Sequence, residues 1–209
     1  MGYASDITRT VPVSGSFDAR QADIYNTVLR ANLKGIEMSR PGVYYRDVHL
    51  AAARIIADGL KDIGLMQGNM HDAVAQGAHT LFFPHGLGHA LGLDVHDMEG
   101  LGENNVGYDD TISRSTEFGL KSLRFGRHVS TGFVLTVEPG IYFIPVLIDR
   151  WEAEKKFAAY INYDVLKDYR TFGGIRIEDD ILITENGCRV LGKPIPKTIE
   201  EIVHLRLQG

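Results

Sequence analysis

The spacing of apolar residues along the chain predicts a fold of the α+β class. Apolar positions recur every three or four residues in 18–39 and 47–63, which predicts two amphipathic helices. Shorter helices are expected at 72–79, 149–160 and 199–205. Alternating patterns and short apolar runs predict strands at 3–13, 81–83, 132–138, 140–145, 173–184 and 187–191. The stretch from 100 to 128 has little apolar periodicity and is expected to be a long loop, which in compact domains is usually functional or disordered.

Length and composition restrict the class of protein. The chain has 209 residues, enough for one sizeable core, and we expect a single domain over 1–209. Its net charge of -5, without a cluster of Lys and Arg, argues against nucleic acid as a partner. No apolar run approaches the roughly 18 residues of a membrane helix, so no membrane association is expected. The single Cys188 excludes an intrachain disulfide and favours a reducing, cytoplasmic location.

The segment HGLGHALGLDVHD places His85, His89 and His96 among glycines that allow close approach of backbone or ligand. No Glu follows the first histidine, as the helical zinc-peptidase motif would require. On this segment alone, hydrogen-bonded core or loop histidines are an equally good interpretation. His49 falls on the flank of the helix expected at 47–63, where no catalytic role is expected.

Carboxylates elsewhere in the sequence favour a metal site. Asp6, Glu138 and Glu178 each lie in an apolar predicted strand, and an unpaired buried carboxylate is costly unless it is neutralised or given a cation. With His89 they would form a set of oxygen ligands and one imidazole that suits Mn2+ most, and also Co2+, Fe2+ or Zn2+. Two such ions about 3.5–4 Å apart would create a hydroxide at neutral pH and polarise a carbonyl, so hydrolysis is expected. Salt bridges to Arg9 or Arg176 are the competing explanation.

Four motifs resemble those of the pita-bread metallopeptidases, the group that contains methionine aminopeptidase, Xaa-Pro aminopeptidase and Xaa-Pro dipeptidase (prolidase). They are, in chain order, YASDITRT, HGLGHALGLDVHD, TVEPGIYF and GGIRIEDD. The resemblance implies the pita-bread (creatinase/aminopeptidase) fold, in which helices cover a curved, mostly antiparallel sheet. It also implies that Asp6 and Glu178 bridge two metals, that His89 and Glu138 complete the first metal's shell, and that Glu138 handles the proton of the attacking water.

The same resemblance implies roles in substrate binding. His85 and His96 match the two family histidines that contact substrate without ligating metal. The stretch GLKSLRFGRHV looks most like prolidase, where Arg124 would receive the free carboxylate of a dipeptide, a task suited to a planar fork of donors. Arg176 is similar to a family arginine that lines the same pocket. A solvated basic edge is the alternative interpretation of the stretch around Arg124.

The sequence departs from the family pattern at its start. The family has an additional aspartate on the strand that precedes YASDITRT, where it binds the second metal. We therefore expect the C-terminal portion of a catalytic domain, lacking the N-terminal domain and the start of the catalytic domain, with an incomplete second metal site and poor activity of its own. For the full-length protein a homodimer is expected.

Taken with the motifs, the residues predict a metal-dependent exopeptidase that hydrolyses the Xaa-Pro bond of dipeptides by a metal-activated hydroxide. One alternative is an Xaa-Pro aminopeptidase acting on longer peptides that contain proline. A second alternative is a metal-free pita-bread binding module or a creatinase-like protein.

Overall fold

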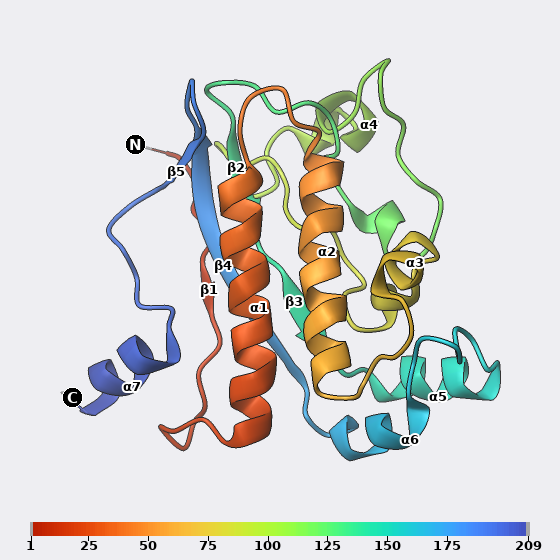
Figure 1. The fold of residues 1–209 in the computed structure, drawn as a ribbon. Coiled ribbons are helices and arrows are strands. Elements are labelled where there is room, and N and C mark those ends of the chain that lie inside the picture. Colours follow the sequence, from red (N-terminus) through yellow and green to blue (C-terminus); the bar gives the residue numbers. More distant parts are fainter. Residues whose placement is uncertain (1, 208–209) are drawn as a thin grey trace.

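The computed structural model describes residues 2–207, and Figure 1 shows their arrangement. Two long helices, α1 (Ala19–Met38) and α2 (Tyr45–Asp62), lie side by side, and α1 packs across one face of a sheet. The remaining helices, turns and loops surround this two-layer unit. The expected α+β class is therefore observed.

Helix α1 forms because both its start and its buried face are encoded locally. The Asp18 carboxylate accepts a hydrogen bond from the backbone N–H of Gln21 (2.8 Å), and the Gln21 side chain accepts one from the N–H of Asp18 (3.0 Å), which is a capping box. Buried residues then recur at helical spacing, at Ile24, Val28 and Ala31. In α2 the same spacing buries Val48, Ala52, Ile56 and Leu60.

The sheet is antiparallel and is organised around β4 (Gly174–Ile183). On one side of β4 lie β2 (Val134–Val137) and β3 (Gly140–Tyr142), and on the other lie β1 (Thr8–Arg9) and β5 (Cys188–Val190). The strand expected at 173–184 is thus confirmed as the central one. The strand expected over 3–13 pairs only at Thr8 and Arg9, so most of that prediction was wrong.

Several shorter elements differ from the predicted ones. The apolar run 81–83 is no strand: Leu81 ends a 3-10 turn, η1 (Ala78–Leu81), and the N–H groups of Phe82 and Phe83 both donate to the His79 carbonyl. The helix expected at 149–160 is α5 (Pro145–Ala153), which begins with a proline in its first turn. The other helical elements are α3 (Met70–Ala75), η2 (Glu99–Leu101), α4 (Glu103–Val106), η3 (Leu120–Ser122), α6 (Tyr163–Leu166), η4 (Lys167–Tyr169) and α7 (Ile199–Leu207).

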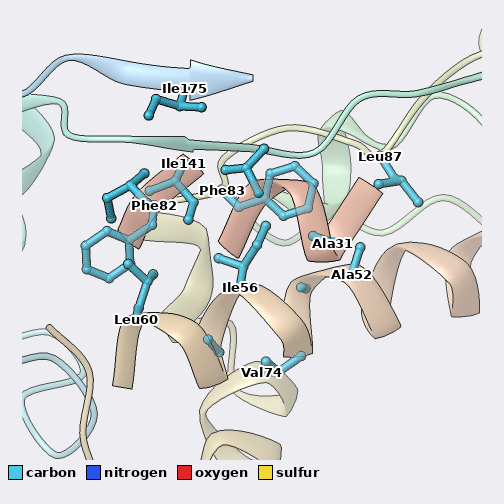
Figure 2. Packing of buried hydrophobic residues seen from close by; sticks show 14 of the residues in the cluster. Ala31, Ala52, Ile56, Leu60, Val74, Phe82, Phe83, Leu87, Ile141 and Ile175 are labelled. Carbon is cyan, nitrogen blue, oxygen red and sulfur yellow. The ribbon is translucent and has the colours of Figure 1, made fainter. Parts of the chain in front are cut away.

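One continuous apolar core joins the helices to the sheet. Figure 2 shows Ile56 and Leu60 of α2 close to Phe82, Phe83 and Ile141. Burial in this core explains why 81–83 is apolar throughout without being a strand, since a buried run of this length has no period that distinguishes strand from turn. The core thereby fixes the start of the segment that carries His85 and His89. Among the described residues, no helix is long and apolar enough to cross a membrane.

Candidate metal centre

Four separate segments bring the predicted ligands to one face of the sheet. Because Thr8 lies opposite Glu178 in the antiparallel register, the residue two positions earlier, Asp6, lies level with Asp180. Its backbone N–H donates to the Asp180 carboxylate, with N···Oδ2 at 3.2 Å. Glu138 follows the last residue of β2, at the strand's end.

The predicted ligands converge. One ligand atom each of Asp6, His89 and Glu178 lie within 4.8 Å of one another. The Nε2 atom of His89 is 3.5 Å from Asp6 Oδ2 and 3.4 Å from Glu138 Oε1. His89 and Glu178 are almost fully buried, at 3 % and 1 % exposure. Three carboxylates and one imidazole, remote in sequence, therefore face one point.

Local contacts orient His89 toward the acids. Its backbone N–H donates to Thr136 Oγ1 (3.0 Å), and its ring Nδ1 lies 3.0 Å from the Ala90 carbonyl oxygen. A carbonyl only accepts, so Nδ1 carries the proton and Nε2 of the neutral ring presents its lone pair. Burial lowers the pKa of His89, which favours this neutral form. A ring held in this way by a backbone carbonyl is typical of metal-ligating histidines.

The acids repel one another. Burial, followed by the charge of Glu178, raises the pKa of Glu138 from its ordinary value to about 8. Burial also raises the pKa of Glu178, and the nearby Asp6 adds to this effect. Such a cluster lowers its energy by taking up protons or a cation. The donor set, mainly hard oxygens with one imidazole nitrogen, fits a divalent metal ion.

His85 and His96 lie in the wall of the cavity beside this cluster. The cavity has a volume of about 280 Å³ and is also lined by His89, Arg124, Glu138 and Arg176, together with Gly86, Gly88 and Ser122. The His96 ring meets that of His89 edge to face, with centroids 4.3 Å apart. His85 Nε2 is 3.1 Å from the Tyr142 hydroxyl, and burial lowers the pKa of His85 to about 4, so the ring is neutral at pH 7.

Both predicted arginines border the cavity. Arg176 lies between two acids of the cluster, with Nη1 3.7 Å from Glu138 Oε2 and Nε 3.8 Å from Glu178 Oε2. At these distances it neutralises part of the negative charge without a close hydrogen bond. Arg124 is paired with Glu99 and Glu103, residues that the sequence analysis did not single out.

Some functional neighbours of the site were not predicted. Thr8 Oγ1 donates to Glu178 Oε2 (2.5 Å), and Thr136 Oγ1 donates to Glu138 Oε1 (3.3 Å). Asp180 was placed on the same face as Glu178 but received no role, although alternation along β4 could have indicated one. His49 was expected on a helix flank, but it lies fully buried in the core.

Comparisons with known proteins show the family. Residues 1–185 match the profile of metallopeptidase family M24. Human Xaa-Pro dipeptidase is 42% identical over 200 residues, which are 96% of this chain and 39% of that protein. A probable Xaa-Pro aminopeptidase of Sordaria macrospora is 42% identical over 200 residues, 96% of this chain and 41% of that protein.

Solved structures show the same likeness. Zn-substituted Escherichia coli aminopeptidase P in complex with product is 37% identical, with a TM-score of 0.74, covering 99% of this chain and 39% of that one. The same enzyme with the inhibitor Pro-Leu gives a TM-score of 0.73 at 37% identity, with the same coverage. The chain thus spans about two fifths of the length of these relatives.

The antiparallel sheet and its covering helices form the pita-bread fold of these relatives. The chain belongs to metallopeptidase family M24. The predicted family and the predicted pita-bread fold are thereby confirmed.

Proposed function

We propose that this chain carries the catalytic metal centre of a peptidase that hydrolyses Xaa-Pro bonds, with dipeptides as preferred substrates. The observation that carries the proposal is the convergence of Asp6, His89, Glu138 and Glu178 on one point of the sheet face. Relatives named Xaa-Pro dipeptidase and Xaa-Pro aminopeptidase support the substrate class. Within this proposal, 1–209 is one domain, the C-terminal portion of a catalytic domain.

The four converging residues would hold a divalent cation. Asp6, Glu138 and Glu178 supply hard oxygens, and the Nε2 lone pair of His89 supplies the nitrogen, a set that favours Mn2+ and accepts Co2+, Fe2+ or Zn2+. When bound, such an ion supplies Lewis acidity, which polarises a carbonyl and lowers the pKa of water. A second ion would share Asp6 and Glu178 and would need a further donor, and we expect it to bind more weakly.

Residues around the cluster then perform the proton and binding steps. Beside a bound cation Glu138 would be ionised, and its carboxylate could accept a proton from water and return it to the leaving amine. Arg176 beside Glu138 balances the charge during that exchange. His85, neutral and fixed by contacts of both ring nitrogens, and His96 would orient the peptide in the cavity.

Arg124 in the cavity lining bears on substrate length. A guanidinium fork pairs well with the free carboxylate of a dipeptide, whereas a longer peptide would have its carboxylate elsewhere. This favours dipeptide hydrolysis. The structural likeness to aminopeptidase P supports a second candidate function, removal of the N-terminal residue from longer peptides with proline next in sequence.

We further infer a homodimeric full-length protein. A cytoplasmic location is proposed from the single Cys188, since a chain without disulfides suits a reducing compartment.

The test combines metal analysis with two substrates. We expect the full-length protein purified after Mn2+ loading to retain metal and to hydrolyse Gly-Pro faster than Gly-Pro-Pro. Glu178→Gln should lose both metal and turnover, whereas Glu185→Gln, an exposed glutamate two residues beyond the same strand, should lose neither. Preference for Gly-Pro-Pro would establish the aminopeptidase candidate. Failure to retain any divalent metal would contradict the peptidase proposal and favour a binding module.

A further inference from the structure

A second cluster of charged residues lies on the opposite face of β4 from the acids. Side chains alternate along a strand, so Asp179 points away from its neighbours Glu178 and Asp180. It accepts hydrogen bonds from Arg9 Nη2 at Oδ1 (2.6 Å) and from Lys197 Nζ at Oδ2 (2.8 Å). The side chains of Asp179 and Arg9 are 5 % and 12 % exposed, so this ion pair is largely removed from water.

The cluster is bonded to the backbone of the segments that carry Asp6 and Glu178. Arg9 Nη1 donates to the carbonyl oxygen of Glu178 itself (2.7 Å) and to that of Thr8 (2.9 Å). Thr8 in turn donates from its hydroxyl to the Glu178 carboxylate. One guanidinium therefore fixes the spacing between β1 and β4 at the position of the metal ligands.

The third acid-bearing segment is bonded to the same cluster through α1. Lys197 Nζ donates to Asn32 Oδ1 (3.0 Å), and Asn32 Nδ2 donates to the carbonyl oxygen of Val137 (3.0 Å), the residue before Glu138. Asn32 is fully buried in the face of α1 that packs on β4. Figure 1 shows α1 lying across β4.

The cluster around Asp179 opposes the electrostatic repulsion among the acids on the other face of β4. Asp6, Glu138 and Glu178 crowd negative charge together, while β1 pairs with β4 over only two residues. The backbone hydrogen bonds of so short a strand give little resistance to separation of β1 from β4. Two partly buried cations around Asp179 hold the three segments together from behind, at backbone atoms within two residues of Asp6, Glu138 and Glu178.

We propose that Arg9, Asp179 and Lys197 are positioning residues of the metal centre, which set its affinity and geometry without touching the ion. The proposal rests on the proposed function, because it assumes that the four converging residues bind a metal. Residues that orient ligands from outside the coordination shell typically change metal affinity by about 10–100-fold when replaced.

The experiment uses Co2+ as the probe, since its visible absorption reports coordination geometry as well as binding. Lys197→Met removes the ammonium group and keeps the aliphatic stem. We expect it to weaken Co2+ binding by about tenfold or more and to change the visible spectrum, with an unchanged far-ultraviolet circular dichroism spectrum of the metal-free protein. Lys197→Arg, which retains a cation, should restore much of the affinity. Lys193→Met, an exposed lysine of the same loop, is the matched control and should bind Co2+ like the wild type.

A second variant addresses loss of folding. Arg9→Lys keeps a charge for Asp179 but cannot also reach the carbonyl oxygens of Thr8 and Glu178, so it should weaken Co2+ binding even if Lys197→Met does not fold. Wild-type affinity and spectrum in whichever of these variants fold would overturn the positioning role while leaving the proposed function intact. A wild-type protein that binds no Co2+ would overturn both.

Discussion

Arg124 Nη1 lies 2.6 Å from Glu99 Oε2, so the arginine expected to receive a substrate carboxylate already has a carboxylate partner. Glu103 Oε1 adds a second acid at 3.1 Å. Glu99 is the first residue of η2, and Glu103 is the first residue of α4. These two short helical turns lie at the start of the long segment between 100 and 128. A dipeptide carboxylate must therefore compete with residues of the protein itself for this guanidinium.

We predict that Glu99→Gln lowers KM for Gly-Pro and that Arg124→Ala raises it. A partly exposed ion pair is worth about 1 kcal/mol or less, so the gain in Glu99→Gln should be at most about fivefold. Steady-state kinetics of the metal-loaded full-length protein measure both effects, with Glu117→Gln as an exposed control. An unchanged KM for Gly-Pro in Arg124→Ala would remove this arginine from the substrate site.

Metal binding should stabilise the fold. An ion at 100 times its dissociation constant adds about 2.7 kcal/mol, which for a chain of this size raises Tm by about 5–10 °C. We expect Mn2+ to raise Tm of the metal-free wild type in this way and EDTA to reverse the effect, measured by differential scanning calorimetry.

The Glu178→Gln variant gives the matching comparison. Its Tm should not respond to Mn2+, because a ligand is lost. Without metal it should be at least as stable as the wild type, because an almost fully buried carboxylate close to Asp6 has been removed. A metal-free variant that is much less stable than the metal-free wild type would show that the repulsion within the cluster is weaker than we infer.

The sequence predicted which side chains lie close together better than it predicted the elements that carry them. Asp6 was expected on a strand over 3–13, yet the backbone pairs only at 8–9, because a strand forms only where a neighbouring strand offers partners. The Asp6 side chain still faces the cluster, because the pairing of residues 8 and 9 with β4 sets the position of Asp6 relative to Glu178. Acids within apolar predicted strands were a sufficient signal that these carboxylates would converge.

The charged cluster behind β4 could not be predicted in the same way. Arg9 and Asp179 are separated by 170 positions in the chain, and Lys197 is separated from Asp179 by 18. No periodicity links such residues, and Arg9 was considered only as a salt-bridge partner of Asp6, Glu138 and Glu178. Only the folded arrangement of α1, β1 and β4 brings them together.

Gly88 should be intolerant of substitution. A Cβ at this position would overlap the carbonyl oxygen of Thr136, an atom of β2 that cannot move without disturbing the sheet. Gly88→Ala should therefore displace His89 from Glu138, weaken metal binding and lower the free energy of unfolding by about 1–3 kcal/mol, the usual cost of overpacking. Urea unfolding and Mn2+ titration measure these changes. Gly100→Ala, where the added Cβ meets open space, should leave both near wild type.

His49 and His79 make stability sensitive to acid. Their ring centroids are 6.4 Å apart in the core, and none of their four ring nitrogens has a hydrogen-bond partner among the described residues. Burial lowers the pKa of His49 to about 3 and that of His79 to about 4, below the ordinary value near 6.5. The unfolded chain therefore takes up protons between about pH 6.5 and these lower values while the folded chain does not. Stability must fall as the pH falls through that window, by up to about 1.4 kcal/mol per pH unit for each histidine.

Replacing His49 by phenylalanine tests this linkage. No hydrogen bond is lost, so stability at pH 8 should stay within about 2 kcal/mol of the wild type, allowing for the larger ring. Between pH 6 and 4 the slope of unfolding free energy against pH should decrease by about 1.4 kcal/mol per pH unit, because one proton fewer is taken up on unfolding. Urea titrations at half-unit pH steps measure the slope, with His71→Gln as the exposed control. Parallel curves for His49→Phe and the wild type would show that His49 takes up its proton alike in the folded and the unfolded chain, contrary to the expected effect of burial.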